Sequence, residues 1–120
     1  MFFFFRKREQ PLDRDALGFH TWHFLHTMAA YYDLKPSSKC QKEMLDFIHL
    51  LAKFYPCKLC SKHFRDKINR NPPIVKSRDG LTRWFHQVHN EVNIANGKAV
   101  FPLECLEERW GPTKGHPKRT

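Results

Sequence analysis

The chain has 120 residues, the usual size of a single domain. Its hydrophobic residues (41%) and aromatic residues (14%) exclude an intrinsically disordered chain, and no stretch reaches the roughly 18 consecutive apolar residues of a membrane span. Lys and Arg outnumber Asp and Glu by 21 to 12, and the net charge of +9 favours an anionic partner such as nucleic acid, phospholipid or a phosphate-bearing cofactor.

The apolar residues recur at helical spacing, which predicts an all-α fold. The first helix is predicted to run from Asp13 or Asp15 to Tyr32, because acidic residues in a first turn suit the helix dipole. Its buried stripe is predicted to contain Trp22, Leu25, Ala29 and Tyr32. After a turn and an N-cap within 36–38, a second helix is predicted to continue to about Tyr55. Its buried face is predicted to contain Met44, Phe47, Ile48, Leu51 and Phe54.

A third helix is predicted to begin at Pro56, which suits a first helical turn, and to end at Asn71-Pro72-Pro73. A fourth is predicted to be capped within 77–79 and to end at Asn96-Gly97. Its inward side chains are predicted to be Leu81, Trp84, Phe85, Val88 and Val92. With a short last helix over 102–110, these elements predict a four-helix bundle plus a fifth helix in one domain of residues 11–110. Residues 1–10 and the basic tail 111–120 are predicted to be flexible.

Cys57 and Cys60 form a C-x-x-C motif at the start of the predicted third helix. Residues three apart share a helix face, so the two sulfurs are close enough to bridge. The helix N-terminus and Lys58 both favour a thiolate, which indicates a redox-active pair. The same motif is half of a structural zinc site, which His86 and His89 could complete. The motif alone leaves both interpretations open.

The predicted fourth helix carries a polar stripe on one face, consisting of His86, His89, Asn90 and Asn93. The apolar residues of this helix bury much of it, and buried polar groups need partners. A polar ligand with a large flat ring would satisfy them, and further stacking and hydrogen bonds could come from Trp22, His26 and Trp110. A solvated polar stripe and ordinary core aromatics are the alternative interpretation.

These motifs occur together in one known family, and the chain resembles the Erv/ALR sulfhydryl oxidases. The resemblance covers roughly residues 11–110 in the family's order. Its matching segments include Thr21-Trp22, Leu25 to Tyr32, Phe47 to Leu50, Lys53 to Cys57 with Cys60, His89 to Asn93, Gly97-Lys98 and Glu108 to Trp110. A C-x-x-C with an H-N-x-x-N at this spacing is specific, and it lowers the weight of the zinc interpretation.

The resemblance implies a bundle that holds FAD at its mouth and an enzyme that oxidises thiols to disulfides. Electrons would pass to oxygen, or to cytochrome c. By position, Cys57 would be the sulfur that the substrate thiolate attacks, and Cys60 the sulfur nearest the flavin. The FAD contacts implied are Arg14, Gly18, Thr21, Trp22, His26, Lys53, His86, His89, Asn90, Asn93, Gly97, Lys98, Arg109 and Trp110.

The resemblance also implies thiol-containing protein substrates, a homodimer and a location in the mitochondrial intermembrane space, the cytosol or outside the cell, with neither nucleic acid nor a membrane span. The family's inter-subunit cysteine is Gln10 here, so we expect a non-covalent dimer. Cys105 lacks its usual partner, since His86 occupies that position, and Cys40 is extra. The family's usual Arg-Ser before Thr-Trp is Phe19-His20 here, which removes one expected cationic contact.

Two other functions remain as alternatives. The first is a zinc-stabilised basic module that binds nucleic acid through its charge, with Cys57, Cys60, His86 and His89 as ligands. The second keeps the fold without turnover, as a signalling or scaffold protein.

Overall fold

The computed structural model describes residues 10–111 and confirms an all-α fold over this range. Its helices are α1 (Arg14–Ala30), α2 (Ser38–Phe54), α3 (Lys58–Arg70), α4 (Arg78–Ala95) and α5 (Leu106–Trp110), and a 3₁₀ helix (Leu103–Cys105) precedes α5. None of the described helices is long and apolar enough to cross a membrane. The predictions of flexibility for residues 1–10 and 111–120 fall almost entirely outside the described residues.

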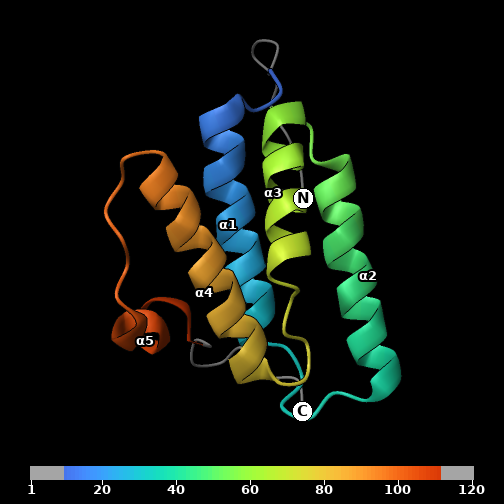
Figure 1. Ribbon diagram of the computed structural model, residues 1–120. Helices are drawn as coiled ribbons and strands as arrows, with labels where there is room; N and C mark the ends of the chain where they lie inside the picture. The colour runs from blue at the N-terminus through green and yellow to red at the C-terminus, as the bar shows by residue number, and fades with distance from the viewer. Residues whose placement is uncertain (1–9, 112–120) are drawn as a thin grey trace, which may run out of the picture.

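The first four helices form the predicted bundle, in which α1 packs against α4 and α2 packs against α3 (Figure 1). The short α5 lies beside α4, and it also contacts α1 (Figure 1). The chain passes from the end of α2 into the start of α3 at the end of the bundle where α1 begins (Figure 1). The C-x-x-C motif therefore lies at one end of the bundle.

Side-chain caps begin the four long helices, as the sequence predicts for most of them. Asp13, Ser37 and Ser77 each accept a hydrogen bond from a backbone N–H three residues on, which satisfies one of the unpaired donors of a first turn. The prediction for Pro56 was wrong, because Cys57 is the N-cap of α3 and Pro56 precedes it. At the end of α4, Gly97 has a φ of +71°, a left-handed conformation that favours glycine after a helix.

The core forms where the stripes of α1 and α4 meet those of α2 and α3. Trp84, Phe85, Leu25 and Ile48 are its largest fully buried apolar side chains. Two predictions for α2 were wrong, because Phe47 and Phe54 are exposed by 37% and 70%. The helix is apolar on more than one side, and only the Ile48 and Ala52 side is buried.

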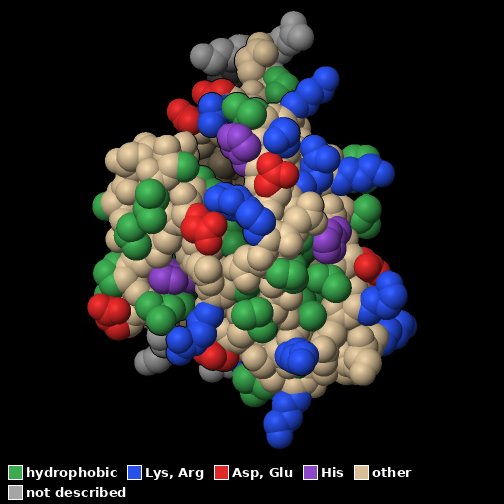
Figure 2. Space-filling view, in the orientation of Figure 1, with side chains coloured by type: hydrophobic (Ala, Val, Ile, Leu, Met, Phe, Trp, Pro, Cys, Tyr) green, Lys and Arg blue, Asp and Glu red, His purple; other side chains and the backbone are tan. Residues whose placement is uncertain are grey.

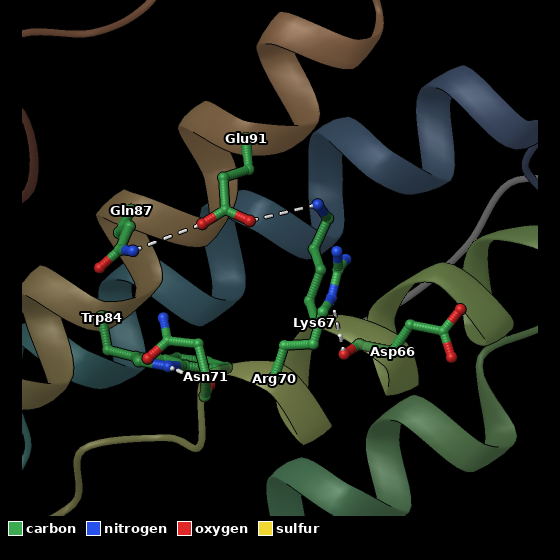
Figure 3. A network of polar contacts seen from close by, with 7 residues as sticks. All are labelled: Asp66, Lys67, Arg70, Asn71, Trp84, Gln87 and Glu91. Carbon is green, nitrogen blue, oxygen red and sulfur yellow. Dashed lines mark hydrogen bonds and ion pairs between the residues drawn. The ribbon is translucent and has the colours of Figure 1, made fainter.

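Polar contacts fix α3 against α4 on the side facing away from α2 (Figure 3). Lys67 on α3 lies 3.3 Å from a carboxylate oxygen of Glu91 on α4, and Gln87 bonds the other oxygen. The indole N–H of Trp84 donates to the carbonyl of Asn71 at 3.0 Å, just after α3 ends. These contacts hold the C-terminal half of α3. Because the helix is one continuous element, its packing along the whole length sets the orientation of the cysteines at its N-terminus.

Candidate functional site

Cys57 and Cys60 form a disulfide at the N-terminus of α3, as the spacing predicts. Their Cα atoms are 5.2 Å apart, and both residues are half-buried. Sγ of Cys57 accepts a hydrogen bond from the backbone N–H of Cys60 at 3.3 Å, so this sulfur is also the cap of the helix. Positive partial charge at a helix N-terminus favours a thiolate there, which suits a disulfide that is opened and closed by thiols.

The structure does not support the zinc alternative. The zinc site would need the thiolates of Cys57 and Cys60 in addition to His86 and His89. Cysteines joined in a disulfide have no thiolate with which to bind zinc. Among the side chains that the structure describes, no three of His, Cys, Asp or Glu converge closely enough to hold a metal ion.

Ser61, the residue after the disulfide, ties α3 to α2. Its buried hydroxyl donates to the carbonyl of Ala52. That carbonyl is among the last four of α2, which have no partner within the helix. The bond thus satisfies the end of one helix and fixes the first turn of the next, immediately beside Cys60.

Cys60 lies on the side of α3 that faces α4. Cys60, Phe64 and Lys67 follow at steps of four and three and so share one side of the helix. The ring of Phe64 contacts Trp84, and Lys67 pairs with Glu91, and both partners are on α4. Cys57, in contrast, is at the cap, where α2 leads into α3.

A second group of predicted site residues meets where α1, α4 and α5 come together. Nε2 of His26 lies 2.8 Å from Nδ1 of His89. The ring of Trp22 stacks on His89, with centroids 4.1 Å apart and planes within 5°. Trp110 stacks on His26, with centroids 4.4 Å apart and an angle of 15°. We call these four side chains the imidazole–indole cluster.

Both imidazoles of the cluster are neutral at physiological pH. Burial lowers the pKa of His26 from 6.5 to about 3, and a proton on the neighbouring His89 and the charge of Arg109 act in the same direction. Burial also lowers the pKa of His89 from 6.5 to about 4, with Arg109 as the next cause. Cationic groups around two neutral, stacked histidines make this region suited to an anionic ligand.

The cluster also presents a buried polar atom without a partner. Nδ1 of His26 forms no hydrogen bond with any described residue, although the side chain is only 1% exposed. Leaving such an atom unpaired costs about 1–3 kcal/mol. A planar aromatic ligand with a polar edge would satisfy Nδ1 and stack on the indoles, so the residues present fit an isoalloxazine or adenine ring.

Asn90 and His86 hold the segment that follows α4. The Asn90 side chain donates to the carbonyl of Phe101 and accepts from its N–H, both at 2.9 Å. His86 Nε2 lies 2.7 Å from the same carbonyl. The prediction that a ligand would satisfy these two side chains was therefore incomplete, because the Phe101 backbone already does so. Nδ2 of Asn93 lies 3.4 Å from Oδ1 of Asn90, at the edge of this arrangement.

Arg109 connects the Phe101 segment to the imidazole–indole cluster. Its guanidinium lies 4.6 Å from the ring centroid of Phe101 and 4.8 Å from that of Trp110. Lys98 is exposed, and its backbone N–H donates to the carbonyl of Asn93 at 2.7 Å. Both cations are near enough to His89 for their positive charge to lower its pKa.

The five remaining predicted FAD contacts lie outside the imidazole–indole cluster. Gly18 and Thr21 are half-buried on α1, and a Cβ at Gly18 would meet open space. Gly97 shapes the turn before Lys98. Arg14 is exposed at the first residue of α1. Nζ of Lys53 lies over the ring of its neighbour Phe54, 5.2 Å from the centroid, so this side chain contacts a residue of its own helix.

Three residues that shape the site were missed in the sequence. His23 packs edge-on to Trp110 and bonds the carbonyl of Phe19 at 2.9 Å. The steps of three from His20 to His23 to His26 were a signal for it. Phe101 and Ser61 act through backbone and helix-end contacts, for which no side-chain pattern gives a signal.

Comparisons with known proteins agree with this geometry. The sequence profile of the Erv1/Alr family matches residues 19–111. The chain is 39% identical over 105 residues to FAD-linked sulfhydryl oxidase ERV1 of Arabidopsis thaliana, covering 88% of this chain and 55% of that protein. It is 38% identical over 104 residues to mitochondrial FAD-linked sulfhydryl oxidase ERV1 of Saccharomyces cerevisiae, covering 87% and 55%. The chain thus spans about half the length of these curated relatives.

Solved structures show the same fold. The crystal structure of the yeast Erv1 core superposes with a TM-score of 0.86 at 34% identity, covering 94% of each chain. The FAD binding domain of Erv1 from Saccharomyces cerevisiae superposes with a TM-score of 0.81 at 37% identity, covering 83% of this chain and 95% of that one.

Proposed function

The chain belongs to the Erv1/Alr family, and on that premise we propose that it is an FAD-dependent thiol oxidase that forms disulfides in thiol substrates. The observation that carries the proposal is the disulfide at the cap of α3, on a helix whose Cys60 side faces α4 and its polar residues. A disulfide buried for stability alone would not need a sulfur at a helix N-terminus.

The imidazole–indole cluster and its cations would hold FAD. Trp22 and Trp110 supply stacking surfaces, and His26 supplies the unpaired Nδ1. Arg109 and Lys98 supply positive charge for the pyrophosphate. Thr21, Gly18, Asn93 and Gly97 are further proposed FAD contacts, whereas the placement of Arg14 and Lys53 gives them less support.

Thiol exchange would occur at Cys57. A substrate thiolate attacks Sγ of Cys57, a bond forms between them, and Cys60 leaves as a thiolate. The second substrate thiol, as its thiolate, then displaces Cys57, so the substrate gains a disulfide and the pair becomes a dithiol. The N–H of Cys60 stabilises the departing Cys57 thiolate. When bound, FAD supplies the two-electron acceptor for this dithiol and the route to oxygen.

The positions of the two sulfurs support these separate roles. Cys60 is on the α4-facing side of α3, together with Phe64 and Lys67, and α4 is the helix that carries His89 of the proposed flavin site. Cys57 is at the end of the bundle, where a substrate segment can approach. Cytochrome c is proposed as an alternative acceptor to oxygen.

We also propose a mitochondrial location, specifically the intermembrane space. Two of the relatives, from Saccharomyces cerevisiae and Schizosaccharomyces pombe, are named as mitochondrial sulfhydryl oxidases. The protein would act there on thiol-containing protein substrates.

An exposed aromatic face supports a non-covalent homodimer. Phe24 on α1 and Phe47 on α2 are in edge contact, with ring centroids 6.4 Å apart, and Leu50 and Phe54 continue the face along α2. These four apolar side chains are exposed by 37–70%. Contiguous exposed apolar surface of this kind usually marks an interface. A second copy of the chain would cover it.

The function is tested by purifying the protein without added flavin, recording its visible spectrum and measuring oxygen consumption with dithiothreitol. We expect a flavin spectrum and thiol-dependent oxygen uptake. A protein that is colourless, and that gains neither property on addition of FAD, would contradict the proposal.

A further inference from the structure

The disulfide lies in the middle of an acid-free stretch of the chain. Between Asp46 and Asp66 the sequence holds no Asp or Glu, but it holds Lys53, Lys58, Lys62 and Arg65. The chain as a whole has 21 cationic and 12 acidic residues, so this stretch has a higher ratio of cationic to acidic residues than the whole chain. Positive charge is therefore concentrated where the substrate must approach.

The cations on α3 share one side of the helix. Lys58, Lys62 and Arg65 follow at steps of four and three, and all three are exposed. Only Lys62 has an ion-pair partner among the described residues: Asp66, 3.3 Å away, where both side chains are at least half exposed. Lys and Arg side chains gather over the adjoining ends of α2 and α3 in the space-filling view (Figure 2).

An apolar side chain lies among these charges. Leu59, between Lys58 and Cys60, is 53% exposed. The surface formed by Lys58, Leu59, Lys62 and Arg65, which we call the cationic face, therefore offers both charge and a hydrophobic contact next to the disulfide. It lies on the opposite side of α3 from the α4 contacts of Phe64 and Lys67.

We propose that the cationic face docks protein substrates whose reactive cysteines are flanked by acidic and apolar residues. The inference rests on the thiol-oxidase function proposed above. Complementary charge raises the rate of encounter and selects among partners, more than it raises the affinity of the final complex. Each turnover oxidises two substrate thiols to one disulfide and reduces Cys57–Cys60 to a dithiol, which the proposed FAD and oxygen then reoxidise.

The test compares two dithiol peptides of equal length that differ only in having Glu or Lys beside the cysteines. Dithiothreitol, which is small and uncharged, is the reference substrate. At about 0.01 M salt, where the Debye length is about 30 Å, we expect kcat/KM for the Glu peptide to exceed that for the Lys peptide on the order of tenfold. At about 1 M salt, where this length is about 3 Å, the ratio should approach one.

Paired charge reversals locate the effect. Lys62→Glu with Arg65→Glu should remove most of the preference for the Glu peptide while leaving dithiothreitol turnover unchanged. The matched control is Lys39→Glu with Lys42→Glu, an equal change of charge at the opposite end of α2. Lys42 pairs with Asp46 four residues on, as Lys62 does with Asp66, so the two variants disturb similar exposed pairs.

The outcomes separate the two proposals. Without dithiothreitol turnover in the flavin-loaded wild type, the thiol-oxidase function itself is wrong. Normal dithiothreitol turnover with equal rates for both peptides, or an equal effect of the two charge reversals, would overturn the cationic face. Stronger inhibition of the Glu-peptide reaction by short duplex DNA or anionic vesicles than by a cysteine-free acidic peptide would show a polyanion or membrane surface, and would also overturn it.

Discussion

Nε2 of His26 and Nδ1 of His89 lie 2.8 Å apart and join the first and fourth helices through a bond between two neutral imidazoles. One ring donates the proton and the other accepts it, so protonating the accepting ring would place two N–H donors against each other. The indoles of Trp22 and Trp110 stack on these rings, which couples the bond to the proposed flavin site.

The first prediction concerns pH. Because the folded pKa of His26 (about 3) is below its unfolded value of 6.5, the unfolded state binds more protons as pH falls below 6.5. The stability from neutral His26 is thus fully present above pH 6.5 and is lost on acidification. Between pH 7.5 and 5 this residue alone should lower the free energy of unfolding by about 2 kcal/mol. Urea unfolding at a series of pH values measures it.

The control for this prediction is His26→Gln, which keeps a polar side chain but does not titrate. It should remove the part of the pH dependence between 7.5 and 5 that His26 causes, and the part that His89 causes should remain, because burial lowers the pKa of His89 to about 4 as well. An unchanged slope in His26→Gln would show that another group causes the acid sensitivity.

The second prediction concerns the Asn90–Phe101 contact. Asn90→Ala removes both hydrogen bonds to the Phe101 backbone and should lower the free energy of unfolding by about 2 kcal/mol. It should also weaken FAD binding, because Phe101 supports Arg109. Thermal unfolding and flavin titration measure the two effects. Gln87→Ala, an exposed amide on the same helix bonded to Glu91, should change stability by no more than about 0.5 kcal/mol.

The third prediction concerns the link between α2 and α3. Ser61→Ala leaves the carbonyl of Ala52 without its donor and should lower the free energy of unfolding by about 1–3 kcal/mol. Ser38→Ala is the control, since Ser38 is exposed at the start of α2. Equal stabilities for the two variants in urea unfolding would mean that the Ser61 bond contributes nothing.

The fourth prediction concerns the remaining cysteines. The structure leaves Cys40 and Cys105 as free thiols, and Cys40 lies 3.7 Å from a carboxylate oxygen of Asp33. Alkylation under denaturing, non-reducing conditions should therefore modify two cysteines per chain. Mass spectrometry should find Cys57–Cys60 as the disulfide, and a non-reducing gel should show a monomer. A reducible dimer band or a Cys40–Cys105 peptide would contradict this expectation.

The helices could be predicted because their signals are local. Asp13, Ser37 and Ser77 cap helices where the apolar period begins, and Asn96-Gly97 ends α4. The exposure of Phe47 and Phe54 could not be predicted, because helical period does not say which of two apolar sides of α2 is covered.

The site could be predicted in part for a similar reason. The C-x-x-C spacing predicted the disulfide, and the polar stripe of α4 indicated a buried polar region. The partner of Asn90 could not be predicted, since Phe101 follows in a loop without periodic pattern and is recognised through its backbone. The His26–His89 bond joins residues 63 apart in sequence, which only the packing of α1 on α4 brings together.

The central claim is that electrons pass from a thiol substrate through Cys57–Cys60 to bound flavin. Its most direct test is anaerobic addition of dithiothreitol to the flavin-loaded protein, with the visible flavin absorbance followed in time. The wild type should bleach, whereas Cys57→Ser and Cys60→Ser should retain FAD and stay oxidised over the same period. Equal bleaching in either serine variant, or no bleaching in the wild type, would contradict the claim.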